Sequence, residues 1–77
     1  MVYYTYLSIV MSNLSEFIRN QRKQYGLTQE ALAERAGVGL HFVRDIEQGK
    51  KSLRMDKVNQ VLELFGAELG PQKQAQQ

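Results

Sequence analysis

The sequence contains no cysteine, no tryptophan and only one histidine. The lack of cysteine excludes disulfides and thiolate metal sites, and one histidine cannot hold zinc alone. No apolar run reaches the roughly 20 residues that a transmembrane helix requires. The 77 residues suffice for one small domain with a modest core, and no set of nucleophile, base and orienting group is visible. We therefore expect no enzyme activity, no cofactor, no metal site, no membrane insertion and no small-molecule substrate.

The N-terminal segment, residues 1–11, is apolar and uncharged, and it holds three of the four tyrosines. Its β-branched and aromatic residues are typical of a strand, which could pair with a second chain; a disordered arm is the alternative. Because position 11 is a second methionine, Met11 is also a candidate for the natural start, with the preceding residues as an upstream extension. The segment lacks the basic region of a secretory signal, so we expect a cytoplasmic protein.

Residues 12–66 carry apolar residues at spacings of three and four, which predicts helices. Ser12 or Asn13 can cap the first helix, with Ser15 near enough to compete, and Thr28 can cap the second. The third begins near Gly39 and the fourth spans about 55–65. The glycines that end the four helices are Gly26, Gly37, Gly49 and Gly66. The predicted fold is an all-α bundle of four to five helices.

The C-terminal residues divide into two short segments. Residues 67–70 are predicted to form a short strand, which would be ended by a Gly-Pro pair. Residues 71–77 are polar and glutamine-rich, which is typical of a disordered tail. The sequence thus predicts short terminal strands around the helical domain.

The connection between the second and third predicted helices is the most informative feature. It is the short segment 36–39, Ala-Gly-Val-Gly, in which Gly37 supplies the positive φ that a sharp turn needs. A turn of three or four residues containing glycine between two short helices is typical of a helix-turn-helix. In that motif the second helix enters the major groove of DNA and the first lies across the backbone.

Three residues of the third predicted helix turn away from its apolar positions and would face the bases: Leu40, His41 and Arg44. Arg44 can bind guanine O6 and N7, His41 can donate to a base or phosphate, and Leu40 can pack on a thymine methyl group. The alternative is that these residues are simply exposed, or that Arg44 forms a helical salt bridge. Asp45 could read a cytosine amino group or belong to a structural ion pair.

Two stretches carry a family resemblance. Residues 26–38, GLTQEALAERAGV, resemble the opening of the Cro/repressor (XRE-type) helix-turn-helix family, and residues 42–50, FVRDIEQGK, are similar to its recognition helix and exit turn. Residues 38–44 and 53–70 are similar, more narrowly, to HipB-type antitoxins, the DNA-binding partners of HipA-type serine/threonine kinase toxins. The resemblance implies a lambda-repressor-like bundle and binding to an operator in double-stranded DNA.

The resemblance also implies roles for individual residues. Gln29, in the first turn of the second helix, would contact a phosphate, with an ordinary solvated residue as the alternative. The family pairs an arginine of the first helix with a glutamate at the end of the third, which implies an ion pair between Arg22 and Glu47. The sequence departs from the family at Gly39 and Leu40, where a Ser or Thr cap and then a polar residue are common.

A basic cluster follows the third predicted helix. It comprises Lys50, Lys51 and Arg54, for which we expect phosphate contacts; a solvated charge cluster is the alternative. Ten Lys and Arg against eight Asp and Glu give a net charge of only +2. The net charge does not show how the charges are distributed. Glutamates of the second predicted helix offset, in the sum, the basic residues that flank the third.

The predicted function is that of a transcriptional repressor acting as a homodimer on a palindromic operator. The resemblance to HipB implies that the chain also neutralises a HipA-like kinase and regulates its own operon, with a C-terminal strand pairing across the two-fold axis. The expected dimer interface comprises Phe65, Ala67, Glu68 and Leu69. The alternative is a protein-interaction module, a toxin-neutralising adaptor whose DNA binding is secondary.

Overall fold

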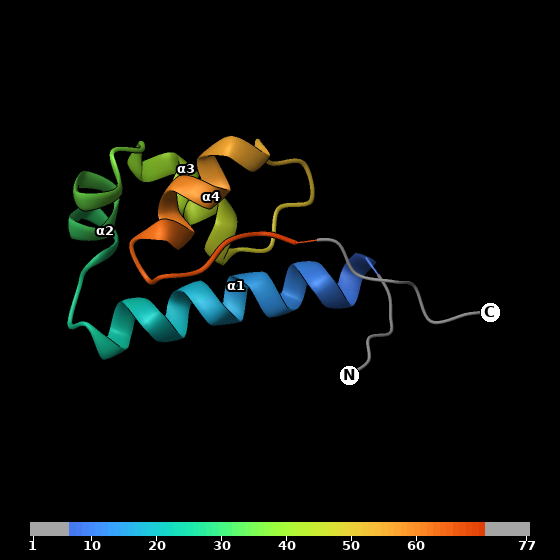
Figure 1. The fold of residues 1–77 in the computed structure, drawn as a ribbon, viewed down its shortest axis with the longest axis horizontal. Coiled ribbons are helices and arrows are strands. Elements are labelled where there is room, and N and C mark those ends of the chain that lie inside the picture. The colour runs from blue at the N-terminus through green and yellow to red at the C-terminus, as the bar shows by residue number, and fades with distance from the viewer. Residues whose placement is uncertain (1–6, 71–77) are drawn as a thin grey trace.

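A computed structural model describes residues 7–70, which form four helices (Figure 1). These are α1 (Leu7–Gln24), α2 (Gln29–Ala36), α3 (Leu40–Glu47) and α4 (Met55–Glu63). The long α1 lies along one side, and the three short helices pack together beside it. Residues 7–70 contain no strand, so the described fold is all-α, as predicted. Across the same range, none of the helices combines the length and the apolar character that a membrane span needs.

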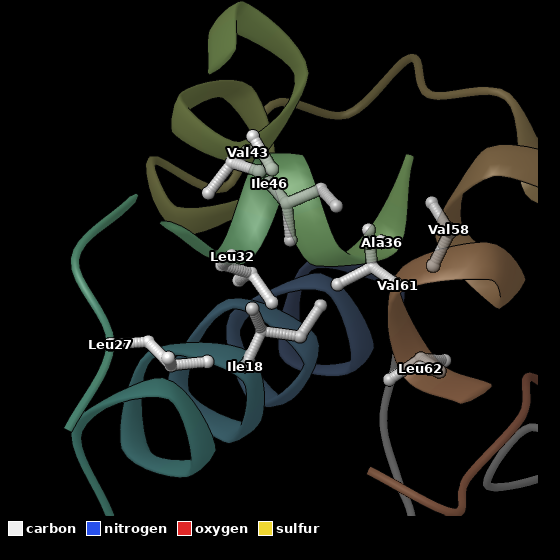
Figure 2. Close-up of a cluster of buried hydrophobic side chains, with 10 residues drawn as sticks. Ile18, Leu27, Leu32, Ala36, Val43, Ile46, Val58, Val61 and Leu62 are labelled. Carbon is white, nitrogen blue, oxygen red and sulfur yellow. The ribbon is translucent and has the colours of Figure 1, made fainter. Parts of the chain in front are cut away.

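The core lies where the apolar faces of the four helices meet (Figure 2). Each helix contributes at least one fully buried side chain at helical spacing, and the largely buried Leu27 joins them from the loop after α1. Burying an aliphatic side chain contributes about 1.5–3 kcal/mol, so these residues supply the main stabilisation of the domain. The most deeply buried side chains are Ile18, Leu32, Val43, Ile46, Val58 and Val61.

The first helix begins at Leu7, earlier than the predicted start near Ser12. The prediction of a strand or a disordered arm over residues 1–11 is therefore wrong for residues 7–11, while residues 1–6 lie outside the described range. Extending an existing helix adds a hydrogen bond for each residue without a new nucleation cost. This cooperativity outweighs the weak strand preference of the β-branched residues in the segment.

Residues 67–70 are extended but form no strand, contrary to the prediction. The segment turns back after α4 and runs beside α1 (Figure 1). Its backbone is held by a side chain, since the N–H of Leu69 donates to Asn59 Oδ1 at 2.7 Å. A strand needs a paired neighbour, which residues 7–70 of a single chain do not offer. The predicted tail, residues 71–77, lies outside the described range.

Two aromatic residues expected on the apolar face of α1 and after it lie at the surface. Phe17 is 39% exposed and Tyr25 is 56% exposed. The Tyr25 ring packs edge-on against Phe65, with the ring centroids 5.3 Å apart. The apolar face of α1 is thus wider than the surface that the other three helices cover.

Candidate nucleic-acid interface

Helices α2 and α3 are joined by the tight turn that the glycine spacing predicted. Thr28 caps α2, because its Oγ1 accepts from the N–H of Ala31 at 3.0 Å. Gly37 ends α2 in the left-handed conformation, with φ at 75°, and its N–H donates to Ala33 O at 2.9 Å. Gly39 then begins α3 without a side-chain cap. This order of helix, turn and helix is a helix-turn-helix.

The turn places strict limits on Gly37. A left-handed backbone is unfavourable for residues with a Cβ, and a Cβ here would lie 3.2 Å from Gln60 Nε2. We expect Gly37→Ala to lower the free energy of unfolding by about 1–2 kcal/mol. Gly39→Ser is the matched control, since its φ is −77° and a Cβ there meets open space. Urea denaturation measures both; equal stability of the two variants would contradict this account of the turn.

The outer side of α3 presents the side chains that the sequence assigned to the bases. His41 and Arg44 are exposed and Leu40 is half-buried, whereas Val43 and Ile46 on the opposite side are buried. Within residues 7–70, the side chains of His41 and Arg44 make no hydrogen bond or ion pair. Their donor groups are therefore free to bind a ligand, and the core fixes which side of the helix they occupy.

The C-terminal end of α3 is anchored by Glu47, which is only 4% exposed. Arg22 of α1 binds its carboxylate through two nitrogens, with Nε at 2.7 Å from Oε2 and Nη2 at 3.1 Å from Oε1. Arg22 Nη1 also donates to Leu27 O at 2.9 Å, and Arg19 donates to the backbone carbonyl of Glu47. The expected pair of Arg22 and Glu47 thus lies in contact and ties α3 to α1.

Gln29 also belongs to this network, and its part in it could not be predicted from the sequence. The residue is half-buried, and its Nε2 donates to Glu47 Oε1 at 3.1 Å. The two residues lie far apart in the sequence and on different helices, so no local spacing signals their contact. Gln29 therefore links the start of α2 to the end of α3, in addition to the phosphate contact expected of it.

The basic residues after α3 are exposed but differ in their surroundings. Lys50 Nζ lies 3.4 Å from Asp45 Oδ2, in an ion pair that water screens. Arg54 binds Asp56 through Nε at 3.2 Å and Nη2 at 2.7 Å, and this contact lowers the pKa of the Asp56 carboxyl. Lys51 makes no hydrogen bond or ion pair within the described part of the chain. Lys51 is thus the cation of the cluster that is most available to a phosphate.

Comparison with known proteins gives a family match and two relatives. A family model described as a helix-turn-helix domain matches residues 13–75. An uncharacterized HTH-type transcriptional regulator of Sinorhizobium fredii is 40% identical over 58 residues, which cover 75% of this chain and 76% of the relative. Another uncharacterized HTH-type transcriptional regulator, from Methanothermobacter thermautotrophicus, is 39% identical over 51 residues, covering 66% of this chain and 74% of the relative.

Proposed function

The chain belongs to the helix-turn-helix domain family, and we propose that it is a transcriptional regulator that reads operator DNA with α3. The observation that carries the proposal is the pair of exposed, unpaired side chains on α3, His41 and Arg44, on a helix whose other side is fixed in the core. A planar guanidinium can donate two parallel hydrogen bonds to guanine O6 and N7. Leu40 would pack on a thymine methyl group beside them. We also propose that the protein works in the cytoplasm.

Sequencing of DNA fragments that are recovered with the purified protein tests this function. Fragments that share one short palindromic sequence are the expected result, because a dimer reads two half-sites one helical turn apart. Recovered fragments without a shared sequence would contradict the proposal.

The phosphates would be held on both sides of α3. Gln29 lies at the start of α2, where backbone N–H groups of the helix end also point outward. Lys50, Lys51 and Arg54 follow α3 and are all exposed. Lys50 and Arg54 would exchange a screened ion pair for a phosphate, which costs little because exposed pairs contribute only about 0–1 kcal/mol. These contacts would set the position of α3 without selecting a sequence.

Lys51→Ala tests the phosphate contacts. We expect the variant to bind every duplex more weakly, and the dependence of log affinity on log salt to become shallower by about one. Fluorescence anisotropy titrations at several salt concentrations measure both quantities. A scrambled duplex is the internal control, since a phosphate contact loses the same affinity on either sequence. A loss confined to the operator would show that Lys51 reads a base.

A homodimer would place two copies of α3 in successive turns of the major groove, about 34 Å apart. A groove of about 360 Å³ supports a dimer surface next to α1. Its apolar lining comes from α1, which contributes the exposed Phe17, from α4 and from the C-terminal segment. The proposed interface comprises Phe65, Ala67, Glu68 and Leu69, and the groove adds Leu14, Phe17 and Leu62.

The regulator would act as a repressor, and as the antitoxin of a HipA-like kinase that regulates its own operon. What favours this finer role is the resemblance of residues 38–44 and 53–70 to HipB-type antitoxins. The groove beside α1 also supports a second function, that of a toxin-neutralising adaptor with secondary DNA binding, because a partner protein could bury the same apolar residues. A kinase-like chain encoded by the adjacent gene, and binding to it, would support the antitoxin role; an unrelated neighbouring gene would favour a simple repressor.

A further inference from the structure

Gln60, on α4, reaches across to the helix-turn-helix. Its Nε2 donates to Ala36 O at 2.9 Å and to Gly37 O at 3.1 Å. Carbonyls at the C-terminal end of a helix lack partners within that helix. A side-chain amide carries two hydrogens on one nitrogen, which is the number these two carbonyls require. Gln60 thus satisfies the end of α2 and the first residue of the turn together.

The surroundings of this contact are closely fitted. The absence of a side chain at Gly37 leaves the space that the Gln60 amide occupies, since a Cβ there would lie 3.2 Å from Nε2. Ala36 is buried in the same core cluster as Val58 and Val61 of α4 (Figure 2). The burial of Ala36 and the two hydrogen bonds from Gln60 therefore both hold the start of the turn against α4.

The two ends of α3 are held in different ways. The C-terminal end is anchored by the buried Glu47 through half-buried partners on α1 and α2. The N-terminal end begins at Leu40, three residues after Gly37, and Gly39 supplies no side-chain cap. The first turn of α3 carries His41, so a small tilt of this end would move a side chain that faces the DNA.

We propose that Gln60 is a positioning residue for DNA recognition: it holds the turn against α4 and so fixes the tilt of α3 in the major groove. The proposal rests on the proposed DNA-binding function. Gln60 and its contact with Gly37 O are exposed, so water can replace that hydrogen bond, whereas the contact with Ala36 O is part-buried and its loss lowers the stability of the fold somewhat. Water holds no fixed geometry, however, and the orientation of α3 is then lost rather than the fold.

The test compares Gln60→Met with the control Gln24→Met. Methionine matches glutamine in length and charge but donates no hydrogen bond. Gln24 is an exposed residue at the end of α1 whose side chain makes no hydrogen bond within residues 7–70. We expect Gln60→Met to lose about three- to tenfold in operator affinity, the net effect of one hydrogen bond, and to keep its affinity for a scrambled duplex. Gln24→Met should match the wild-type protein on both.

The ratio of the two affinities separates positioning from stability. Partial unfolding lowers the affinity for operator and scrambled duplex by the same factor, because only the folded fraction binds. A ratio of operator to scrambled affinity that stays at the wild-type value, with or without an equal loss on both duplexes, would overturn the proposal. Gln60→Asn is the second variant, since it keeps the amide but shortens its reach by one methylene, and the same fall in the ratio is expected. A wild-type protein that cannot distinguish the duplexes would instead refute the proposed function itself.

Discussion

Arg22→Ala is expected to lower the free energy of unfolding by about 3–5 kcal/mol. The change removes both guanidinium contacts from a carboxylate that is only 4% exposed, and leaves Gln29 as its remaining side-chain partner among the described residues. It also removes the donor to the carbonyl of Leu27. Native domains have a total stability of about 5–15 kcal/mol, and small domains lie toward the low end, so this loss should leave the variant only marginally stable. Urea denaturation followed by circular dichroism measures the loss.

Two further variants make this prediction specific. Arg35→Ala is the matched control. Arg35 is an exposed arginine in the last turn of α2, and its side chain makes no hydrogen bond or ion pair within residues 7–70. It should change stability by less than about 0.5 kcal/mol. The double variant Arg22→Met, Glu47→Leu should recover most of the loss, since a buried ion pair replaced by apolar groups is often neutral. A loss below about 1 kcal/mol for Arg22→Ala would show that the buried pair does not anchor α3.

Arg44→Ala is expected to lower operator affinity by about 1–3 kcal/mol, which is about 5- to 150-fold, and to relax the preference at one base pair. The fold should be unaffected, because the Arg44 side chain is exposed and makes no hydrogen bond or ion pair within the described residues. Anisotropy titrations against the operator, and against variants of it at each base pair, measure the affinity and the position of the relaxed preference.

Arg44→Lys separates the charge of this residue from its shape. Lysine keeps the positive charge but lacks the planar fork, so the salt dependence should stay near that of the wild-type protein while the base preference weakens. If Arg44→Ala keeps both its affinity and its selectivity, then α3 does not enter the groove with this side facing the bases.

The parts of the fold that could be predicted from the sequence rest on local chemistry. Gly37 ends α2 and Thr28 begins it through contacts that span three or four residues, so the turn could be read directly from residue types. The division of α3 into a buried side and an exposed side follows from helical spacing alone. The pair of Arg22 and Glu47, by contrast, came from family resemblance, because its members lie on separate helices.

The parts that could not be predicted depend on contacts between distant segments. Gln29 and Gln60 resemble any exposed glutamine in the sequence, yet one meets Glu47 and the other meets the turn. The segment 67–70 looks like a strand, but its conformation depends on Asn59 and on the neighbouring α1. Phe17 and Tyr25 have the spacing of core residues, and only the packing of the other helices shows that the core does not cover them.

The central claim is that α3 reads a DNA sequence, and one titration tests it most directly. The operator recovered with the purified protein is compared with a scrambled duplex of equal length and composition, at near-physiological salt. We predict that the operator binds at least about a thousandfold more tightly, in the range of specific regulators. Both affinities should fall with salt, since phosphate contacts release counterions. Equal affinity for the two duplexes would contradict the account.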